Sequence, residues 1–205
     1  MRRIHTLCAS VLLIVAIVGC ADLTEVLGPD RREHEPDVVY DPTPPAVVDA
    51  MLDLAAVKPG DRLYDLGSGD GRIVIAAAKR YGVHGVGLEV DAALIERANE
   101  NAAREGVEAL VEFRKEDIFT ADFHDATVVT LFLGTELNLK LKPRLLASLA
   151  PGARVVSHEY DMGLWRPEVT RFIRGHRLYL WTVPRRAEAP AVGPGAAQEQ
   201  PAAGR

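Results

Sequence analysis

The sequence contains almost no cysteine. Of its 205 residues only Cys8 and Cys20 carry a thiol, and both stand near the beginning of the chain. The rest of the chain therefore cannot form a disulfide, use a thiolate or bind a metal through cysteine. Because a disulfide framework is absent, cysteine usage does not decide in which compartment the protein works.

An excess of positive charge and a repeated unit are also missing. The formal net charge is −5, which gives no basic bias toward nucleic acid. No self-similarity with a period of about 20–50 residues is found. Beyond His5, the histidines are scattered along the chain: His34, His84, His124, His158 and His176. Since their spacing is not that of metal ligands, no metal site is predicted. The hydrophobic fraction of 48% is enough for one domain with a full core.

Long apolar runs are scarce, and the clearest is Leu7–Val18. It is too short to span a membrane comfortably but suits the apolar region of a signal sequence. Gly19-Cys20 then resembles the lipobox of bacterial lipoproteins, in which Cys20 would be lipidated; an uncleaved anchor is the alternative. We predict a signal, lipoprotein-type or anchor segment over 1–20 and a polar linker over 21–37. The protein is therefore expected to be membrane-associated, and the sequence does not decide on which side of the membrane it lies.

The strongest pattern in the chain runs from Leu63 to Val74. An alternating apolar run reaches Asp65 and is followed by Gly67, Gly69 and Gly71, after which an alanine-rich helical pattern begins. Strand, glycine turn and helix in this order form a nucleotide site. Glycine lets the ligand approach the backbone closely, and the helix points its free N–H groups at that ligand.

The spacing of the glycines and the acids that follow them indicate which kind of nucleotide-containing ligand the site would bind. The dinucleotide fingerprint G-x-G-x-x-G needs glycine at position 72, which is Arg72 here. Glu89 ends the next predicted strand, where a ribose-binding acid belongs, and Asp117 ends the strand after that. Asp65, Glu89 and Asp117 are therefore expected at one edge of a parallel sheet, where ligands of open α/β sheets bind.

The remaining elements complete an α/β pattern. Apolar spacing predicts helices from Thr43 to Lys58, from Ile73 to Tyr81, from Asp91 to about Arg104 and around Leu137–Leu149. Further strands are predicted over 126–132 and 154–157, and strands 169–174 and 176–183 form a hairpin at Gly175. We predict an α/β domain over 38–185 with a mostly parallel, seven-stranded sheet that ends in an antiparallel hairpin. A disordered tail is predicted over 186–205.

The glycine motif also carries a resemblance. Residues 67–79, Gly-Ser-Gly-Asp-Gly-Arg-Ile-Val-Ile-Ala-Ala-Ala-Lys, are similar almost letter for letter to the mitochondrial lysine methyltransferases that act on the adenine nucleotide translocase and the ATP synthase c-subunit. The likeness continues through Pro42-Thr43, Arg104–Val107, Arg154–Val156 and Trp165–Pro167. A weaker likeness reaches the nucleosomal lysine methyltransferases that lack a SET domain. The resemblance implies a Rossmann-like class I methyltransferase fold, S-adenosylmethionine as cofactor, and a protein lysine as acceptor, with a membrane protein as one candidate substrate.

The same resemblance implies roles for the acids. Glu89 would accept from two ribose hydroxyls and Asp117 from the adenine amino group, unless Asp117 only caps a turn at Ile118. Asp65 would lie near the methionyl ammonium or order the glycine loop, and Thr43 would contact the cofactor or cap its helix. The predicted cofactor-binding residues are Thr43, Asp65, Gly67, Ser68, Gly69, Gly71, Glu89, Asp117 and Ile118.

The acceptor side is expected after the fourth and fifth strands. Methyl transfer from a sulfonium needs placement of the nucleophile and exclusion of water, so a catalytic triad is not required. A lysine must be neutral to attack, and a dry aromatic pocket lowers its pKa. The catalytic candidates are Thr130, Asn138, His158, Tyr160 and Trp165. Phe132 and Trp165 are equally well explained as core residues.

Two other functions compete with this interpretation. An NAD-dependent oxidoreductase would use the same kind of glycine turn, but Arg72 and Asp117 argue against it. Export would favour a non-catalytic, membrane-tethered binding module, because S-adenosylmethionine is made and held in the cytoplasm. The intact set of Asp65, Glu89 and Asp117 argues against loss of the site. No nucleic-acid partner is expected, and a monomer is favoured.

Overall fold

The computed structural model describes residues 40–185. The signal or anchor segment, the linker and the tail predicted over 1–20, 21–37 and 186–205 lie outside these residues. Within them no helix is long and apolar enough to cross a membrane.

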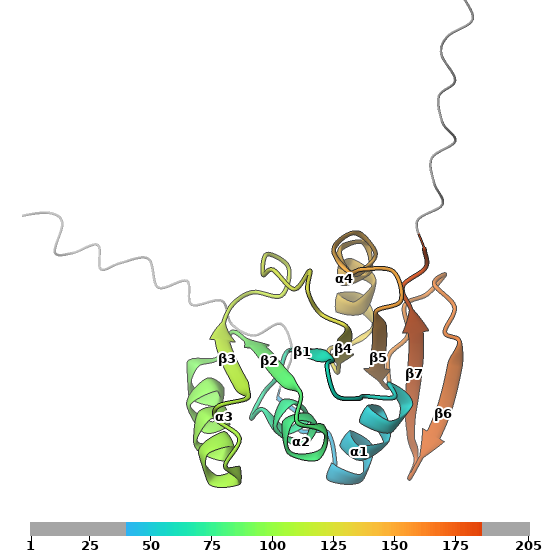
Figure 1. Ribbon diagram of the computed structural model, residues 1–205. Coiled ribbons are helices and arrows are strands. Elements are labelled where there is room, and N and C mark those ends of the chain that lie inside the picture. Colours follow the sequence, from blue (N-terminus) through green and yellow to red (C-terminus); the bar gives the residue numbers. More distant parts are fainter. Residues whose placement is uncertain (1–39, 186–205) are drawn as a thin grey trace, which may run out of the picture. The chain divides into compact units, whose positions relative to one another are not determined.

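One mixed sheet organises the described chain (Figure 1). Its strands are β1 (Arg62–Leu66), β2 (His84–Glu89), β3 (Val111–Lys115), β4 (Val128–Leu131), β5 (Arg154–His158), β6 (Val169–Ile173) and β7 (His176–Thr182). Their spatial order is β3-β2-β1-β4-β5-β7-β6. The first five strands in this order are parallel, whereas β7 pairs antiparallel with both β5 and β6. The predicted fold class is therefore confirmed.

Helices cover both faces of the sheet (Figure 1). They are α1 (Pro45–Leu54), α2 (Arg72–Tyr81), α3 (Ala92–Glu105) and α4 (Thr135–Ser148). Alternation along each strand divides the core: Leu63 packs with α1 and α2, whereas its neighbour Tyr64 packs on the opposite face with α4. The central strands are buried on both faces, which explains their almost wholly apolar sequences.

Helix α1 begins later than predicted, because its N-cap is one residue further along the chain than Thr43. Pro44 is its N-cap and Pro45 its first residue. The residue before a proline is disfavoured in the helical conformation, so Pro45 keeps Pro44 extended and moves the start of the helix past Thr43. The expectation that Thr43 caps the helix is therefore wrong, and its buried side chain is available for another contact.

Other elements also differ from the prediction. Helix α1 ends at Leu54 rather than at Lys58. Strand β3 ends at Lys115, so Asp117 lies in the turn beyond it rather than at its tip. Helix α4 continues through Pro143, which could have divided it. Buried Leu141 and Leu145 hold both halves of α4 against the sheet, and this packing outweighs the one backbone hydrogen bond that a proline removes.

Candidate cofactor and acceptor site

The glycine loop between β1 and α2 folds against the carboxyl end of β2. The backbone N–H groups of Gly67 and Ser68 both donate to the carbonyl oxygen of Leu88, at 2.9 and 3.0 Å. The Gly71 N–H donates back to the Ser68 carbonyl at 2.9 Å. These bonds turn the chain sharply at the sheet edge and set the first turn of α2 above it.

Several positions in this loop require glycine for steric reasons, and two of them face aromatic rings. Gly69 and Gly71 have φ angles of +54° and +79°, a region that side chains rarely allow. A Cβ atom at Gly69 would lie 2.6 Å from the ring of Tyr40, and one at Gly71 would lie 2.5 Å from the ring of Phe113. The loop thus presents bare backbone at the place where the sequence predicted a nucleotide.

Glu89 at the end of β2 is fixed by backbone amides. One carboxylate oxygen accepts from the Gly69 N–H at 2.9 Å, and the other accepts from the N–H groups of Val90 and Asp91 at 2.8 and 3.0 Å. The side chain is buried. Glu89 is therefore not a solvent-exposed strand end, and its carboxylate joins the glycine loop to the start of α3.

Asp65 lies at the centre of the same edge. Its carboxylate is buried and accepts from the Thr130 hydroxyl at 2.7 Å, across the pairing of β1 with β4. Burial raises the pKa of Asp65 to about 7; the Thr130 hydrogen bond opposes this rise, and the negative charges of Glu89 and Asp70 add to it. A nearby cation would favour the charged form of this carboxyl group.

Arg72 connects the glycine loop to the segment before α1. Its guanidinium donates twice to the Asp70 carboxylate, at 2.9 and 2.7 Å, and once to the Thr43 carbonyl at 2.8 Å. Arg72, which stands where the dinucleotide fingerprint has its third glycine, therefore stabilises the fold around the loop. It positions residues 40–44 beside the loop, with the Tyr40 ring over Gly69.

Asp117 forms a turn after β3. One carboxylate oxygen accepts from the Phe119 N–H at 2.8 Å, and its carbonyl accepts from the N–H groups of Thr120 and Ala121. This is the turn cap that the sequence offered as an alternative role. The turn still lies beyond the end of β3, at the edge that carries Asp65 and Glu89.

The loop retains an unsatisfied polar atom that fits a nucleotide-type ligand. Ser68 Oγ is buried and has no hydrogen-bond partner within residues 40–185. It stands over Gly87 of β2, where a Cβ atom would come within 2.5 Å. Buried hydroxyls normally find a partner. The bare backbone, the orphaned hydroxyl and the buried acids are together suited to S-adenosylmethionine.

Aromatic side chains gather where β4 and β5 end. The Phe132 ring lies 4.0 Å from the ring of His158 and is stacked with Tyr160 at 5.9 Å between centroids. Burial lowers the pKa of His158 to about 4, Glu159 opposing and His176 reinforcing that change, so its imidazole is neutral at pH 7. These residues come from the region predicted to receive the acceptor.

Asn138 of α4 holds the chain on both sides of His158 by hydrogen bonds. Its side-chain nitrogen donates to Ser157 Oγ and to the Tyr160 carbonyl, both at 3.0 Å. Its Oδ1 is buried and lacks a hydrogen-bond partner in the described part of the chain. Trp165 points elsewhere: its ring contacts Trp181 at 5.8 Å, its carbonyl accepts from the Trp181 indole at 2.7 Å, and it packs against the core.

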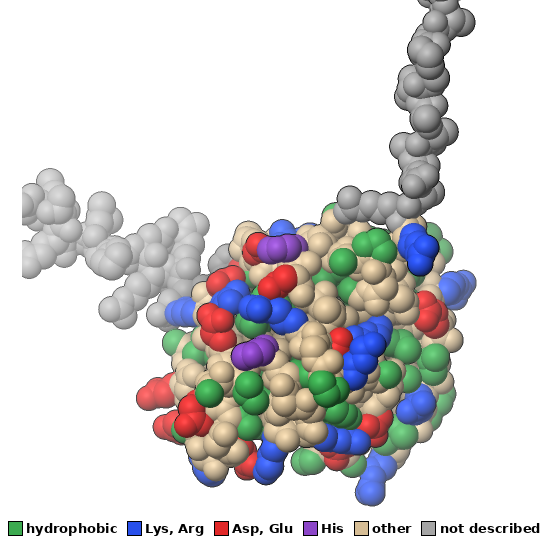
Figure 2. Space-filling view, viewed as in Figure 1, with side chains coloured by type: hydrophobic (Ala, Val, Ile, Leu, Met, Phe, Trp, Pro, Cys, Tyr) green, Lys and Arg blue, Asp and Glu red, His purple; other side chains and the backbone are tan. Residues whose placement is uncertain are grey.

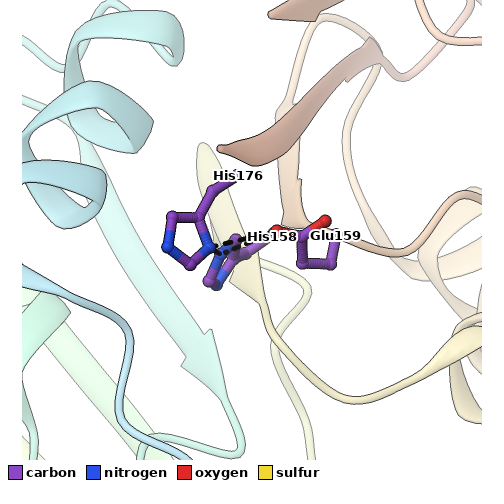
Figure 3. A group of neighbouring side chains, drawn as sticks. All are labelled: His158, Glu159 and His176. Atoms are coloured by element: carbon purple, nitrogen blue, oxygen red, sulfur yellow. Dashed lines mark hydrogen bonds and ion pairs between the residues drawn. The ribbon is translucent and has the colours of Figure 1, made fainter. Parts of the chain in front are cut away.

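Three ionisable side chains meet where β5 and β7 pair; the sequence named His158 as a catalytic candidate but did not predict this meeting. His158 Nε2 lies 3.0 Å from His176 Nδ1, and Glu159 Oε1 lies 3.1 Å from the same nitrogen (Figure 3). The description of these histidines as scattered is wrong in space, because the antiparallel register sets His158 opposite Leu178, two residues from His176. Glu159 itself has a φ of +64°, which is uncommon for a residue with a side chain.

The fold and this edge define a class. A parallel sheet closed by an antiparallel hairpin, with a glycine loop after β1 and an acid after β2, is the arrangement of Rossmann-like S-adenosylmethionine-dependent methyltransferases. A solved structure described as an RNA methyltransferase from Salinibacter ruber, in complex with S-adenosyl-L-homocysteine, superposes with a TM-score of 0.71. It is 53% identical and covers 72% of this chain and 96% of its own.

Sequence comparison gives the family. Residues 65–169 match the ANTKMT methyltransferase domain. A protein-lysine N-methyltransferase from Saccharolobus islandicus is 44% identical over 155 residues, 73% of this chain and 96% of the relative. The adenine nucleotide translocase lysine N-methyltransferase of Mus musculus is 36% identical over 120 residues, and the chain spans about half of its length. The chain belongs to the ANTKMT methyltransferase domain family and is an S-adenosylmethionine-dependent methyltransferase.

Proposed function

We propose that this enzyme is a protein-lysine N-methyltransferase. The observation that carries the proposal is the 44% identity with the Saccharolobus islandicus protein of that name, since the match spans nearly the whole relative. The mammalian relatives with this domain are named as lysine methyltransferases too. The oxidoreductase and the non-catalytic module are not supported by these relatives.

The cofactor is proposed to lie across the carboxyl ends of β1, β2 and β3. When bound, S-adenosylmethionine supplies an activated methyl group. Asp65 would face its methionyl ammonium, Glu89 its ribose hydroxyls, and the turn at Asp117 and Ile118 its adenine. Gly67, Ser68, Gly69 and Gly71 would lie along it, and the Ser68 hydroxyl would gain a partner. Thr43 would close the site from the side of α1.

The acceptor lysine is proposed to approach over Phe132 and Tyr160. An aromatic, poorly hydrated surface disfavours the ammonium form and so lowers the pKa of a lysine amine. Thr130 lies between this surface and Asp65, and the unpaired Oδ1 of Asn138 is an acceptor suited to orienting an N–H donor. His158 would contribute a neutral ring to the wall. Trp165 remains a weaker candidate, because its ring packs on the core.

RNA is the competing acceptor, and one comparison favours it. The Salinibacter ruber protein, 53% identical in its solved structure, is described as an RNA methyltransferase. The charge of this chain argues against RNA: its formal net charge is −5, and on the face seen in Figure 2 acidic and basic side chains are interspersed. Proteins that bind RNA phosphates usually present a basic patch.

One labelling experiment distinguishes the two acceptors. The full-length enzyme is incubated with methyl-labelled S-adenosylmethionine and, separately, the protein and RNA fractions of a bacterial extract. We expect label in protein, recovered as N-methyllysine after acid hydrolysis, and little label in RNA. At limiting S-adenosylmethionine Glu89→Ala should strongly reduce this signal, while Glu108→Ala, which removes an exposed acid in the turn after α3, should keep it. Label confined to RNA would contradict the proposal.

We further propose that the substrate is membrane-associated and that the enzyme is tethered near it. The support is the lipobox-like Gly19-Cys20 after a short apolar run, together with the named substrate of the mouse relative, a translocase. Several acyl chains on Cys20 would hold the enzyme firmly at a bilayer. Wild type, but not Cys20→Ser, should take up labelled palmitate in a bacterial host and sediment with membranes. Equal fractionation without label in either protein would remove Cys20 as the anchor.

A further inference from the structure

We propose that His158, Glu159 and His176 form a binding site for one divalent transition-metal ion, with zinc as the ion that fits best. The three residues come from the end of β5, the residue after it and the first residue of β7. None of the three ligands is among the residues assigned to the cofactor, although Thr43, which is assigned there, contacts His158. The proposal does not depend on which acceptor the enzyme methylates.

The distances suit a metal ion. His158 Nε2, His176 Nδ1 and Glu159 Oε1 are separated by 3.0, 3.1 and 3.6 Å. A circle through three atoms at these separations has a radius of about 1.9 Å, so a point about 2.0–2.1 Å from each atom lies just outside their plane. That is the bond length of zinc to imidazole nitrogen and carboxylate oxygen. Figure 3 shows the side chains converging on one another.

Proton counting favours a cation over ordinary hydrogen bonds. His176 Nδ1 lies close to both His158 Nε2 and Glu159 Oε1, yet a ring nitrogen either donates one hydrogen or accepts one. If it donates to Glu159, it can offer His158 Nε2 only a share of the same hydrogen, in a weaker three-centre bond. A metal ion at the centre removes this conflict, because all three atoms then offer a lone pair to the same partner.

The surroundings orient the ligands as in known metal centres. His158 Nδ1 lies 3.3 Å from the Thr43 hydroxyl, which can fix the tautomer that leaves Nε2 unprotonated. The Arg177 N–H donates to Glu159 Oε1 at 3.2 Å, and the Glu159 N–H donates to the Arg177 carbonyl at 2.7 Å. The left-handed backbone at Glu159 turns its carboxylate toward the histidines and away from the direction that an extended strand would give it.

Exposure and ligand number define the kind of site. His158 is buried, whereas about a third of the Glu159 and His176 side chains is exposed, so an ion can enter from the solvent. Two histidines and one carboxylate supply three ligands and leave a fourth position for water or another donor. Through His158 the ion would brace β5 against β7 and, through Thr43, the segment before α1.

The test is metal binding by the full-length chain, purified without a histidine tag and stripped with a chelator. Cys8→Ser and Cys20→Ser are introduced throughout, so that thiols do not bind the probe. Zinc is titrated against a chromophoric chelator, and cobalt(II) absorption reports the coordination geometry. We expect one zinc ion per chain, tetrahedral cobalt bands and a melting temperature raised by zinc. Denaturation followed without metal confirms that each variant is folded.

Variants assign the binding to these side chains. His176→Gln and Glu159→Gln affect partly exposed residues and should fold, yet each should lower zinc affinity at least tenfold and remove the tetrahedral bands. His84→Gln removes an exposed histidine at the start of β2 and should bind zinc like the parent. Absence of stoichiometric zinc binding in the parent, or equal affinity in the parent and His176→Gln, would overturn the proposal.

Discussion

A single carboxyl group, that of Asp65, should give this protein an unusual pH dependence. Its pKa of about 7 lies above the ordinary value of 3.8, so between these pH values the folded chain holds a proton that the unfolded chain has lost. The free energy of unfolding therefore falls as the pH rises from about 4 to about 7, and this contribution stays constant above that range.

Asp65→Asn isolates the effect, because asparagine cannot ionise but can still accept from Thr130. The wild type should lose stability relative to this variant, on the order of a few kcal/mol, between pH 4 and pH 7. Urea unfolding of both proteins at several pH values measures the difference, and Glu108→Gln serves as the exposed control. A difference that does not change with pH would mean that Asp65 ionises normally.

Glu89 provides the second prediction at this scale. Glu89→Ala leaves the N–H groups of Gly69, Val90 and Asp91 without their acceptor and removes the proposed ribose contact. We expect S-adenosylmethionine to bind more weakly by about 1–3 kcal/mol, measured by calorimetry. Unchanged affinity would exclude Glu89 from the site. The control Glu108→Ala changes an exposed residue in the turn after α3 and should bind the cofactor like wild type.

At the scale of elements, the glycine loop and the helix that it introduces should respond unequally to alanine. Gly71 and Gly82 flank α2 and both have positive φ angles, +79° and +66°. A Cβ atom at Gly71 would collide with the Phe113 ring and lie 3.0 Å from Ala98, whereas nothing lies within 4 Å at Gly82.

Both substitutions should therefore destabilise the fold, but to different degrees. Gly82→Ala meets only the backbone penalty, about 1 kcal/mol. Gly71→Ala adds a collision that α3 or β3 must relieve by moving, and should cost at least 1–3 kcal/mol more. Chemical denaturation compares the two variants with wild type. Equal losses would show that Phe113 moves aside without cost.

Local sequence patterns explain why most elements were predictable. The strand, glycine turn and helix around Asp65, and the Asp91 cap of α3 that accepts from the Ala93 N–H, involve neighbours in sequence. The prediction that Thr43 caps α1 was wrong because either Pro44 or Pro45 could be the first residue of the helix. The sequence does not show which of them is. Its actual partner, His158, lies 115 positions away. Patterns within one element carry no information on such a pair.

At the scale of the whole molecule, the two edges of the sheet have opposite characters. At the carboxyl ends of the parallel strands, beside Asp65 and Glu89, the Ser68 hydroxyl has no hydrogen-bond partner among the described residues. At the amino ends, the Asp61 carboxylate is fully hydrogen-bonded. It accepts from Lys58 N–H, from Thr127 Oγ1 and from the Arg154 guanidinium, which also donates to the carbonyls of Ala55 and Ala56. This network joins the end of α1 to β1, β4 and β5.

Asp61 should therefore be important for stability. Burial alone would raise its pKa, but the hydrogen bonds from Lys58, Thr127 and Arg154 and the charge of Arg154 lower it below 3.8. Its contribution is present above pH 4 and is lost as the pH falls below that value toward the folded pKa.

Asp61→Ala should cost about 3 kcal/mol at neutral pH, because Arg154 loses its partner in a largely buried place. Asp53→Ala breaks an exposed ion pair with Arg80 and should cost under about 1 kcal/mol. Thermal and urea unfolding at pH 7 and pH 3.5 measure both variants. Similar losses for both variants, or an Asp61 effect that persists unchanged at pH 3.5, would contradict this account.

The meeting of His158 with His176 was not predictable from spacing. Seventeen residues separate them, including the irregular stretch before β6, and no pattern indicates that β7 rather than β6 lies next to β5. The family resemblance gave the class of fold, whereas the register that pairs His158 with Leu178 emerges only from packing in three dimensions.

The position of β7 between β5 and β6 also has a consequence for synthesis on the ribosome. Strands β1 to β4 have neighbours made before or soon after them, but β5 gains its second neighbour only when the chain has been translated through Thr182. Until then β5 is an open edge, to which the strand of another nascent chain could pair. If synthesis stopped before β7, the chain would contain the strands proposed to bind the cofactor. The surface beside β5 that is proposed to receive the acceptor would then be exposed.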